Sequence, residues 1–343
     1  MTVAVEFDKV NIVFGDHPEK ALPMMDKGMS RADIQKATGQ VLGVHDCSLT
    51  VEKGEILVLM GLSGSGKSTL LRAVNGLNPV CRGKVTVHEE GWNCEVGSAS
   101  APDLLRVRRE CVAMVFQQFG LLPWRSVREN VGLGLELAGM DIAARRAKVD
   151  QQLALVGLSD WAERKVGELS GGMQQRVGLA RAFATEAPIL LMDEPFSALD
   201  PLIRTRLQDE LLELQAKLRR TIIFVSHDLD EAFKLGNRIA LMEGGRIVQC
   251  GTAREIIANP VSDYVADFVN HMNPLSVLTA RDAVEPTPNV TPTAGQTDID
   301  TPIKAVMEKL KDETRALEVV ENGAVVGQVS RRTVIARLIG PRA

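Results

Sequence analysis

The sequence has no long apolar run. No stretch reaches the roughly 18 consecutive apolar residues that a membrane-spanning helix needs, so we expect no bilayer-spanning segment. The first ten residues include acidic side chains and contain no apolar core of a secretory signal. Any role at a membrane is therefore expected to be peripheral.

An excess of charge and a cysteine framework are also missing. The formal net charge is −4, and such a chain has no general basic field with which to coat nucleic acid. The cysteines are odd in number, are scattered and form no C-x-x-C pair, so we expect reduced thiols rather than disulfides or a metal site. They are Cys47, Cys81, Cys94, Cys111 and Cys250.

The chain does have the length and the patterning of a large α/β protein. Its 343 residues, 45% of them hydrophobic, suit one large domain with an appendage, or two domains. Buried strand patterns alternate with helical ones, which predicts a mainly parallel, layered sheet. We predict a first domain over 1–272 with a helical insert at about 120–175, a linker at 273–302, and a small α/β unit at 303–343.

An insertion at residues 16–40 separates the first two strand patterns, 3–14 and 42–51. It is polar and able to form helix, and Ser30-x-x-Asp33 is a helix start signal within it.

One glycine-rich loop has the pattern of a phosphate-binding P-loop. It follows the apolar run Ile56-Leu57-Val58-Leu59-Met60 and precedes a helical pattern over 70–77. Its glycines let backbone N–H groups surround an anion, and the helix that follows directs its positive end to the same place. Lys67 is expected to reach the β- and γ-phosphates, and the Ser68 hydroxyl to hold Mg²⁺. The loop is Gly61-Leu62-Ser63-Gly64-Ser65-Gly66-Lys67-Ser68-Thr69.

A second buried strand pattern, 189–192, is followed by Asp193 and Glu194. Ligands of α/β sheets bind at the carboxyl ends of the strands. There, one acid can hold Mg²⁺ through water and the other can act on the attacking water. The alternative is a strand that simply ends in a polar turn.

A second glycine turn, Ser170-Gly171-Gly172, opens another helix pattern and is a candidate anion site. One chain has one P-loop, so this site needs a phosphate from elsewhere. A second copy placed head to tail would supply it, with each ATP between one P-loop and the partner's turn. The alternative is a helix cap without a ligand.

Three further residues are weaker candidates. His227 follows the strand pattern 222–225 and can face the γ-phosphate, although a lone histidine is more often structural. Gln117 ends a strand and can ligate Mg²⁺ or the attacking water. Phe14 can stack on adenine or pack in the core.

Taken together, these residues resemble the ATP-binding subunit of ABC transporters. Residues 61–69 match the Walker A loop, 189–194 the Walker B strand, and 169–174 the signature LSGGQ with Met173 for Gln. Gln117 matches the Q-loop, 197–200 the D-loop and His227 the switch histidine. The resemblance implies a dimer that encloses ATP and Mg²⁺, with Glu194 as general base. It also implies that Ser170, Gly171, Gly172 and Asp200 reach the partner's nucleotide.

A narrower resemblance is to the importer subunits for glycine betaine, proline betaine and choline. The insertion at 16–40 and the stretches 61–66, 201–204 and 226–232 carry it. Betaine-type members usually carry two tandem CBS modules, whereas residues 303–343 look like one shortened CBS-like unit. We therefore expect a choline importer before a glycine betaine or proline betaine importer.

The resemblance also implies partners and a location. The solute is not expected to bind here, because a quaternary ammonium ion needs an aromatic cage and this chain has one tyrosine and three widely spaced tryptophans. Membrane permease subunits and a periplasmic or lipid-anchored binding protein are implied, with this chain on the cytoplasmic face of the inner membrane. The stretch 119–124 is an apolar candidate for permease contact, or else for internal packing.

Other classes of protein are also compatible with a P-loop. A soluble ABC ATPase acting on nucleic acid would need a basic face and tends to carry two ATPase units or long coiled coils. A kinase or GTPase would have no use for the Ser-Gly-Gly turn. An exporter often has its membrane span in the same chain.

Overall fold

The computed structural model describes residues 2–118, 120–270, 278–286 and 293–339. The chain divides into two compact units. The first comprises residues 1–227 and 235–250, and the second comprises residues 228–234 and 251–343. This grouping differs from the expected boundary at residue 272.

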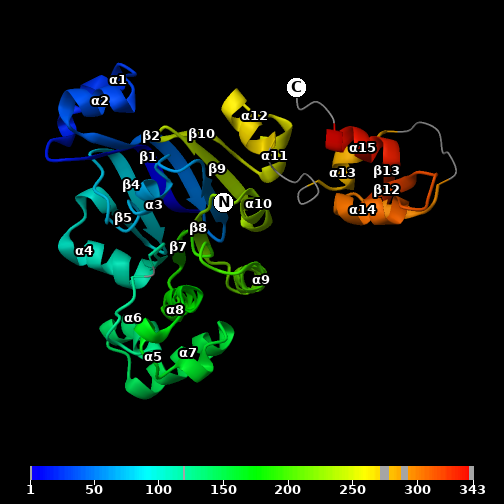
Figure 1. The fold of residues 1–343 in the computed structure, drawn as a ribbon. Coiled ribbons are helices and arrows are strands. Elements are labelled where there is room, and N and C mark those ends of the chain that lie inside the picture. The colour runs from blue at the N-terminus through cyan, green and yellow to red at the C-terminus, as the bar shows by residue number, and fades with distance from the viewer. Residues whose placement is uncertain (1, 119, 271–277, 287–292, 340–343) are drawn as a thin grey trace. The chain divides into compact units, whose positions relative to one another are not determined.

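A six-stranded sheet forms the centre of the first unit, in the order β10-β9-β3-β8-β7-β6 (Figure 1). Strands β9, β3, β8, β7 and β6 run parallel. The strands β3, β7 and β8 are buried along their whole length, which explains why their sequences are apolar except for Asp193 at the end of β7 and Thr221 at the start of β8. Their bounds are β3 (Ile56–Met60), β6 (Val112–Val115), β7 (Ile189–Asp193), β8 (Thr221–Val225), β9 (Arg238–Glu243) and β10 (Arg246–Gly251).

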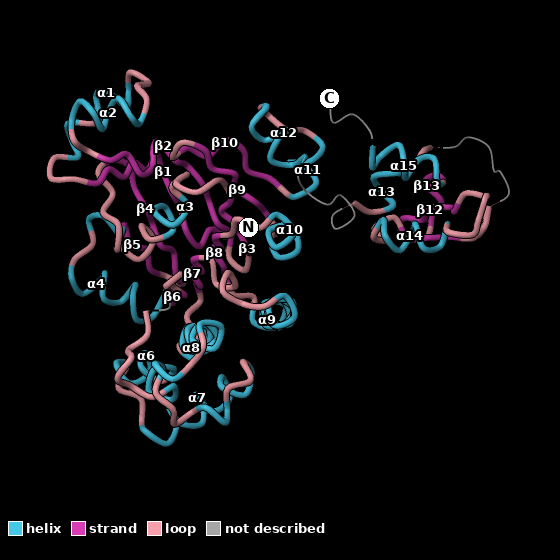
Figure 2. The backbone as a smooth tube through the Cα atoms, in the orientation of Figure 1, coloured by secondary structure: helices cyan, strands magenta, loops and turns pink. Residues whose placement is uncertain are grey.

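An antiparallel sheet of the order β2-β1-β4-β5 is the second layer (Figure 2). Buried side chains of β1, β2 and β4 form one hydrophobic cluster with those of β3, β7, β8 and β9. Strand β5 was not expected, because its four residues are too few for an alternating pattern to stand out in a hydrophilic stretch. The bounds are β1 (Val3–Phe14), β2 (Val41–Glu52), β4 (Arg82–Glu89) and β5 (Trp92–Glu95).

The first unit contains a helical insert. Figure 1 shows its helices grouped together, with α8 between them and the parallel strands. Its own core includes Val131, Leu153 and Val177. The helices from the P-loop onward in this unit are α3 (Lys67–Leu71), α4 (Ala101–Arg106), α5 (Val127–Val131), α6 (Leu133–Leu137), α7 (Ile142–Leu155), α8 (Gly171–Ala184) and α9 (Pro201–Leu218).

The insertion at 16–40 forms two short helices, α1 (Leu22–Asp26) and α2 (Arg31–Thr38). The Ser30 side chain accepts a hydrogen bond from the backbone N–H of Asp33, so the expected helix start is present. Met25 and Ile34 are buried against Val13 and Leu42 of the adjoining strands.

The second unit has a small sheet in the order β11-β12-β13 with its own hydrophobic core. The core includes Leu278, Ala280 and Ile299, which lie inside the stretch expected to be a linker, and two elements form there. The linker interpretation is therefore wrong for 278–286 and 293–302; residues 273–277 and 287–292 lie outside the described residues. The strands are β11 (Gln296–Asp298), β12 (Leu317–Glu321) and β13 (Ala324–Val329). The remaining helices are α10 (Leu229–Leu235), α11 (Ala253–Ala258), α12 (Asp263–Asn270), α13 (Ala280–Ala283), α14 (Ile303–Leu310) and α15 (Arg331–Ile339).

Among the described residues, no helix is both long enough and apolar enough to span a bilayer.

Candidate functional site

The glycine-rich loop joins β3 to α3 and depends on glycine at two positions. At Gly61 a Cβ would lie 2.1 Å from the carbonyl oxygen of Met242, and at Gly66 it would lie 2.6 Å from that of Gly43. Both residues also have positive φ, +145° and +101°. Any other residue would displace neighbouring backbone, so the loop can keep its tight path only with glycine.

Helix α3 is shorter than the sequence predicts, because it ends at Leu71. The bonds from Ala73 N–H to the Leu70 carbonyl and from Val74 N–H to the Leu71 carbonyl continue it as tighter turns. The shortening does not affect the start of the helix. Its first-turn N–H groups are those of residues 67–69, at the end of the loop.

Lys67 folds back onto the loop. Its Nζ donates to the carbonyls of Gly61 (2.8 Å) and Leu62 (2.9 Å). Burial lowers the pKa of the ammonium, while the nearby charges of Glu194 and Asp193 oppose that shift. The cation is thus held beside the two acids.

Asp193 is fully buried at the end of β7, with both carboxylate oxygens occupied. Oδ1 accepts from the Ser68 hydroxyl at 2.6 Å, and Oδ2 pairs with Arg72 Nη2 at 2.8 Å. A buried carboxylate needs such partners. A serine hydroxyl and a carboxylate oxygen in contact are also a suitable donor set for Mg²⁺. Arg72 lacks any sequence signal except its place one helical turn after Ser68.

Glu194 lies next to Asp193 but faces other side chains. It has a positive φ of +49°. Its Oε2 is 3.2 Å from Gln117 Nε2 and 3.4 Å from His227 Nδ1. The structure therefore brings together three residues that the sequence placed at the ends of three separate strands, 77 and 33 residues apart, and the parallel sheet explains why.

The main chain of Glu194 is fixed by helix α8. The side-chain amide of Gln175 donates to the Glu194 carbonyl at 3.2 Å, and its oxygen accepts from Ala198 N–H at 3.1 Å. The Ser197 hydroxyl donates to the same carbonyl at 3.0 Å. Gln175 is buried. Sequence reasoning did not single it out, since a glutamine within a helix carries no signal of its own.

The Ser170-Gly171-Gly172 turn begins α8, and the Ser170 side chain accepts from Met173 N–H at 3.4 Å. Asp200 caps α9 in the same way, accepting from Ile203 N–H at 3.0 Å. Within the described residues, no hydrogen bond or ion pair joins either segment to the P-loop.

Phe14 lies at the end of β1 beside the loop. A Cβ on Gly43 would be 2.9 Å from its ring and 3.1 Å from the Thr69 methyl. The Phe14 side chain is exposed by 39%, so one part of the ring is free to take a stacked base.

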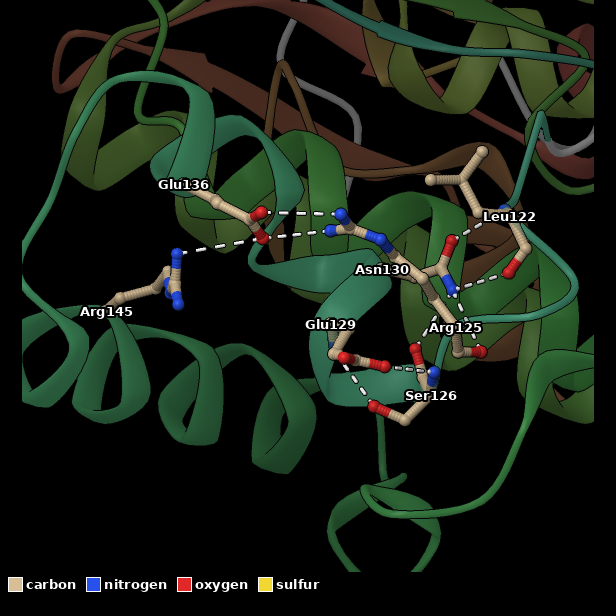
Figure 3. Close-up of polar contacts among 7 residues, drawn as sticks. All are labelled: Leu122, Arg125, Ser126, Glu129, Asn130, Glu136 and Arg145. Carbon is tan, nitrogen blue, oxygen red and sulfur yellow. Dashed lines mark hydrogen bonds and ion pairs between the residues drawn. The ribbon is translucent and has the colours of Figure 1, made fainter.

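In the stretch predicted for permease contact, 119–124, some side chains are packed inside and others are exposed. Leu121 packs against the core of the helical insert, whereas Trp124 is 67% exposed. Phe119 lies outside the described residues. Nearby, Ser126 and Glu129 cap α5, Asn130 bonds the Leu122 backbone, and Glu136 pairs with Arg125 and Arg145 (Figure 3). Of these residues, Arg125, Glu129, Glu136 and Arg145 line a cavity of about 560 Å³.

Comparison with known proteins shows the family. A family model described as ABC transporter matches residues 44–197. The ATP-binding protein ProV of the glycine betaine/proline betaine transport system of Escherichia coli (strain K12) is 46% identical over 336 residues. The match covers 96% of this chain and 81% of ProV.

This chain belongs to the ABC transporter family as an ATP-binding subunit. The ATP-binding protein TmoW of the trimethylamine N-oxide transport system of Ruegeria pomeroyi is 42% identical to the subunit, over 95% of this chain and 94% of TmoW. In a solved structure, the ATP-binding cassette MJ0796 is a dimer in a post-hydrolysis state bound to ADP and Pi. It matches 72% of this subunit and 98% of that chain, with a TM-score of 0.62 and 28% identity.

The subunit is an ATPase with the α/β P-loop fold of ABC cassettes and a helical insert. The expected fold class and enzyme class are thus confirmed. The preference for choline has no support in these relatives, whose names give glycine betaine, proline betaine and trimethylamine N-oxide.

Proposed function

We propose that this subunit hydrolyses ATP to energise the import of a methylated ammonium solute, with glycine betaine or proline betaine first. The identity to ProV over most of both chains carries the proposal. The shared chemistry of these solutes is a nitrogen with methyl or alkyl groups in place of hydrogens. Glycine betaine therefore replaces choline as the first candidate.

Trimethylamine N-oxide is the second candidate, and one observation favours it. The match to TmoW covers 94% of that protein, whereas about a fifth of ProV lies outside the match. The match therefore covers a larger share of TmoW than of ProV, whereas the sequence identity is higher to ProV.

The proposed nucleotide site is the loop 61–69 with the acids after β7. Backbone N–H groups and Lys67 hold the phosphates, and Phe14 stacks on adenine. Mg²⁺ would be held by Ser68, by the Gln117 side-chain oxygen and, through water, by Asp193. When bound, the ion neutralises charge on the phosphates.

Glu194 is the proposed general base. Its Oε2 lies between Gln117 and His227, and these two neighbours orient the carboxylate toward the attacking water and the γ-phosphate. A base must be held within hydrogen-bond reach of the proton that it removes. The positive φ and the Gln175 contact fix the main chain from which this carboxylate extends.

The second half of the site is proposed to come from another copy of the subunit, through Ser170, Gly171, Gly172 and Asp200. Two observations support this. The cassette MJ0796 is dimeric in its ADP- and Pi-bound form. Within one described chain, these residues have no bond to the P-loop.

Permease subunits and a periplasmic or lipid-anchored binding protein are the other proposed partners, at the cytoplasmic face of the inner membrane. Trp124 is the proposed permease contact, because an indole exposed by 67% next to the Gln117 loop is available for burial by a partner. We propose no nucleic-acid partner, in line with the net charge of −4.

Uptake of labelled solutes tests the transported class. The subunit is reconstituted in proteoliposomes with its permease and binding protein, and glycine betaine, trimethylamine N-oxide and choline are compared. We expect ATP-dependent uptake of glycine betaine that is lost with Glu194→Gln. Uptake of trimethylamine N-oxide alone would establish the second candidate. Uptake of choline alone, or of none of the three, would contradict the proposal.

A further inference from the structure

The insertion at residues 16–40 has no part in the site described so far, yet it begins two residues after Phe14 and ends three residues before Gly43. Its helices are anchored by Met25 and Ile34 in a small core shared with β1 and β2. The Arg82–Asp26 ion pair, 2.8 Å, adds a second attachment to β4. The insertion is therefore fixed firmly beside the nucleotide site.

Arg31, the first residue of α2, bonds the P-loop directly. Its Nη1 donates to the Gly64 carbonyl at 2.7 Å, and its Nη2 donates to the Gly43 carbonyl at 2.7 Å. Gly64 belongs to the loop proposed for the phosphates, while Gly43 lies against the Phe14 ring proposed for adenine. One guanidinium thus joins the two sides of the site.

Arg31 is half-buried, and its guanidinium is closely approached by the turn between β9 and β10. A Cβ on Gly245, in the turn between β9 and β10, would lie 2.5 Å from Nη2. The Gly245 N–H donates to the Ser65 carbonyl at 3.1 Å, so the same turn also supports the loop. Arg31 Nε is buried and has no hydrogen-bond partner among the described residues. Proteins rarely leave such a donor unsatisfied, and here the two carbonyl bonds offset its cost.

The bond to Gly64 fixes a peptide plane. In a trans peptide the C=O and the following N–H point in opposite directions. With the Gly64 oxygen held on Arg31, the Ser65 N–H points back into the loop, where it donates to the Leu62 carbonyl at 3.2 Å. This N–H is one of the groups available to a phosphate once the Leu62 bond opens.

We propose that Arg31 is a positioning residue for ATP, which sets the orientation of the Gly64–Ser65 peptide and holds the phosphate side of the site against the adenine side. The insertion at 16–40 thereby acts on nucleotide affinity without touching the nucleotide. The inference rests on the proposed role of residues 61–69.

The experiment measures KM and kcat for ATP in the full-length subunit, and the affinity for a fluorescent ATP analogue. Arg31→Ala is expected to raise KM and the dissociation constant about tenfold, because both guanidinium bonds are lost and the Gly64–Ser65 peptide is no longer held, with kcat within about twofold. Arg31→Lys keeps the charge and one donor, so it is expected to recover most of the affinity. Lys36→Ala is the matched control, since Lys36 is an exposed cation on the same helix.

Amide hydrogen exchange in the nucleotide-free protein gives a second readout. Arg31→Ala is expected to speed exchange in the peptide covering residues 62–68 and to leave the helical insert unchanged. If Arg31→Ala does not fold, Arg31→Lys and Arg31→Gln must show the same graded rise in KM.

Two results would overturn the proposal. One is an unchanged KM with normal exchange in Arg31→Ala; the other is a fall in kcat without a change in KM. The variant Lys67→Ala shows whether such a result contradicts only the role of Arg31 or also the assignment of residues 61–69 as the phosphate-binding loop. If Lys67→Ala loses ATP and Arg31→Ala does not, only the role of Arg31 is wrong. If Lys67→Ala binds ATP normally, the assignment of the loop is wrong.

Discussion

Two adjacent acids at the end of β7 have different surroundings, and that difference separates their roles. Asp193 is fully buried, and Ser68 and Arg72 occupy its oxygens. Glu194 is turned away from it by a left-handed backbone conformation and faces Gln117 and His227. The first carboxylate is fixed and compensated by a cation. The second contacts Gln117 and His227, which agrees with its proposed role as general base.

Replacing Glu194 by Gln should separate binding from hydrolysis. The amide has the same shape but cannot take a proton from water, so ATP binding is expected to persist while turnover falls about 10²–10⁴-fold. Steady-state phosphate release and equilibrium ATP binding measure the two effects. Glu213→Gln, an exposed acid on α9, serves as control. Near-normal hydrolysis would remove Glu194 from the role of base.

The buried thiols should be unreactive in the folded protein. Burial raises the pKa of both Cys47 and Cys111 to about 11, so the thiolate fraction at pH 8 is roughly 10⁻³. Because these thiols titrate lower when the chain unfolds, folding stability is expected to fall as pH rises from about 9 to 11. Mass spectrometry after alkylation at pH 8 should find Cys47 and Cys111 unmodified when Cys81 and Cys250 are labelled. Equal labelling of all the cysteines in native protein would contradict this.

At the scale of elements, the path of the phosphate-binding loop is set by sterics. Gly61 and Gly64 both have positive φ, but only Gly61 is enclosed by backbone: its Cβ would meet the Met242 carbonyl at 2.1 Å, whereas a Cβ on Gly64 would meet nothing within 4 Å. A substitution at Gly64 therefore measures only the strain of a left-handed backbone, whereas one at Gly61 adds a steric clash.

Alanine at these two glycines should give unequal losses. Gly64→Ala is expected to cost about 1–2 kcal/mol, the usual penalty of a left-handed alanine. Gly61→Ala is expected to cost more and to abolish ATP binding, because the loop must move away from β9. Urea unfolding and a fluorescent ATP analogue measure both. Equal effects of the two substitutions would show that space at Gly61 does not decide the loop's path.

Much of this arrangement can be predicted from the sequence, because buried parallel strands are unbroken apolar runs and their ends are marked by the polar residues that follow. The loop 61–69 and the positions of Gln117, Asp193 and His227 could be found in that way. Strand β5 and helix α13 could not, since each has only four residues, too few for a periodic pattern to be recognised. The roles of Arg31, Arg72 and Gln175 depend on contacts across the fold, which local pattern does not encode.

At the scale of the whole molecule, one chain supplies a P-loop and a Ser-Gly-Gly turn that are not bonded to each other within the described residues. The second unit has a hydrophobic core of its own. We expect a second copy of the chain to place its Ser-Gly-Gly turn opposite this P-loop.

ATP should drive the formation of that dimer. Glu194→Gln with ATP and Mg²⁺ is expected to shift from monomer to dimer in analytical ultracentrifugation. Adding Gly171→Asp should prevent the shift, because the carboxylate would repel the partner's phosphates, while ATP binding to each monomer is kept. Gly167→Asp is the matched control, since a Cβ at either glycine meets nothing within 4 Å. A dimer that forms equally well with Gly171→Asp would refute the shared site.

The amide of Gln175 joins α8, the helix that starts at the Ser-Gly-Gly turn, to the carbonyl of Glu194. We therefore expect a tilt or slide of this helix to move the main chain of Glu194 as well. A force on the first turn of α8 would then change the orientation of the Glu194 carboxylate in the same chain. We therefore expect events at the Ser-Gly-Gly turn to reach the proposed base through the Gln175 side chain.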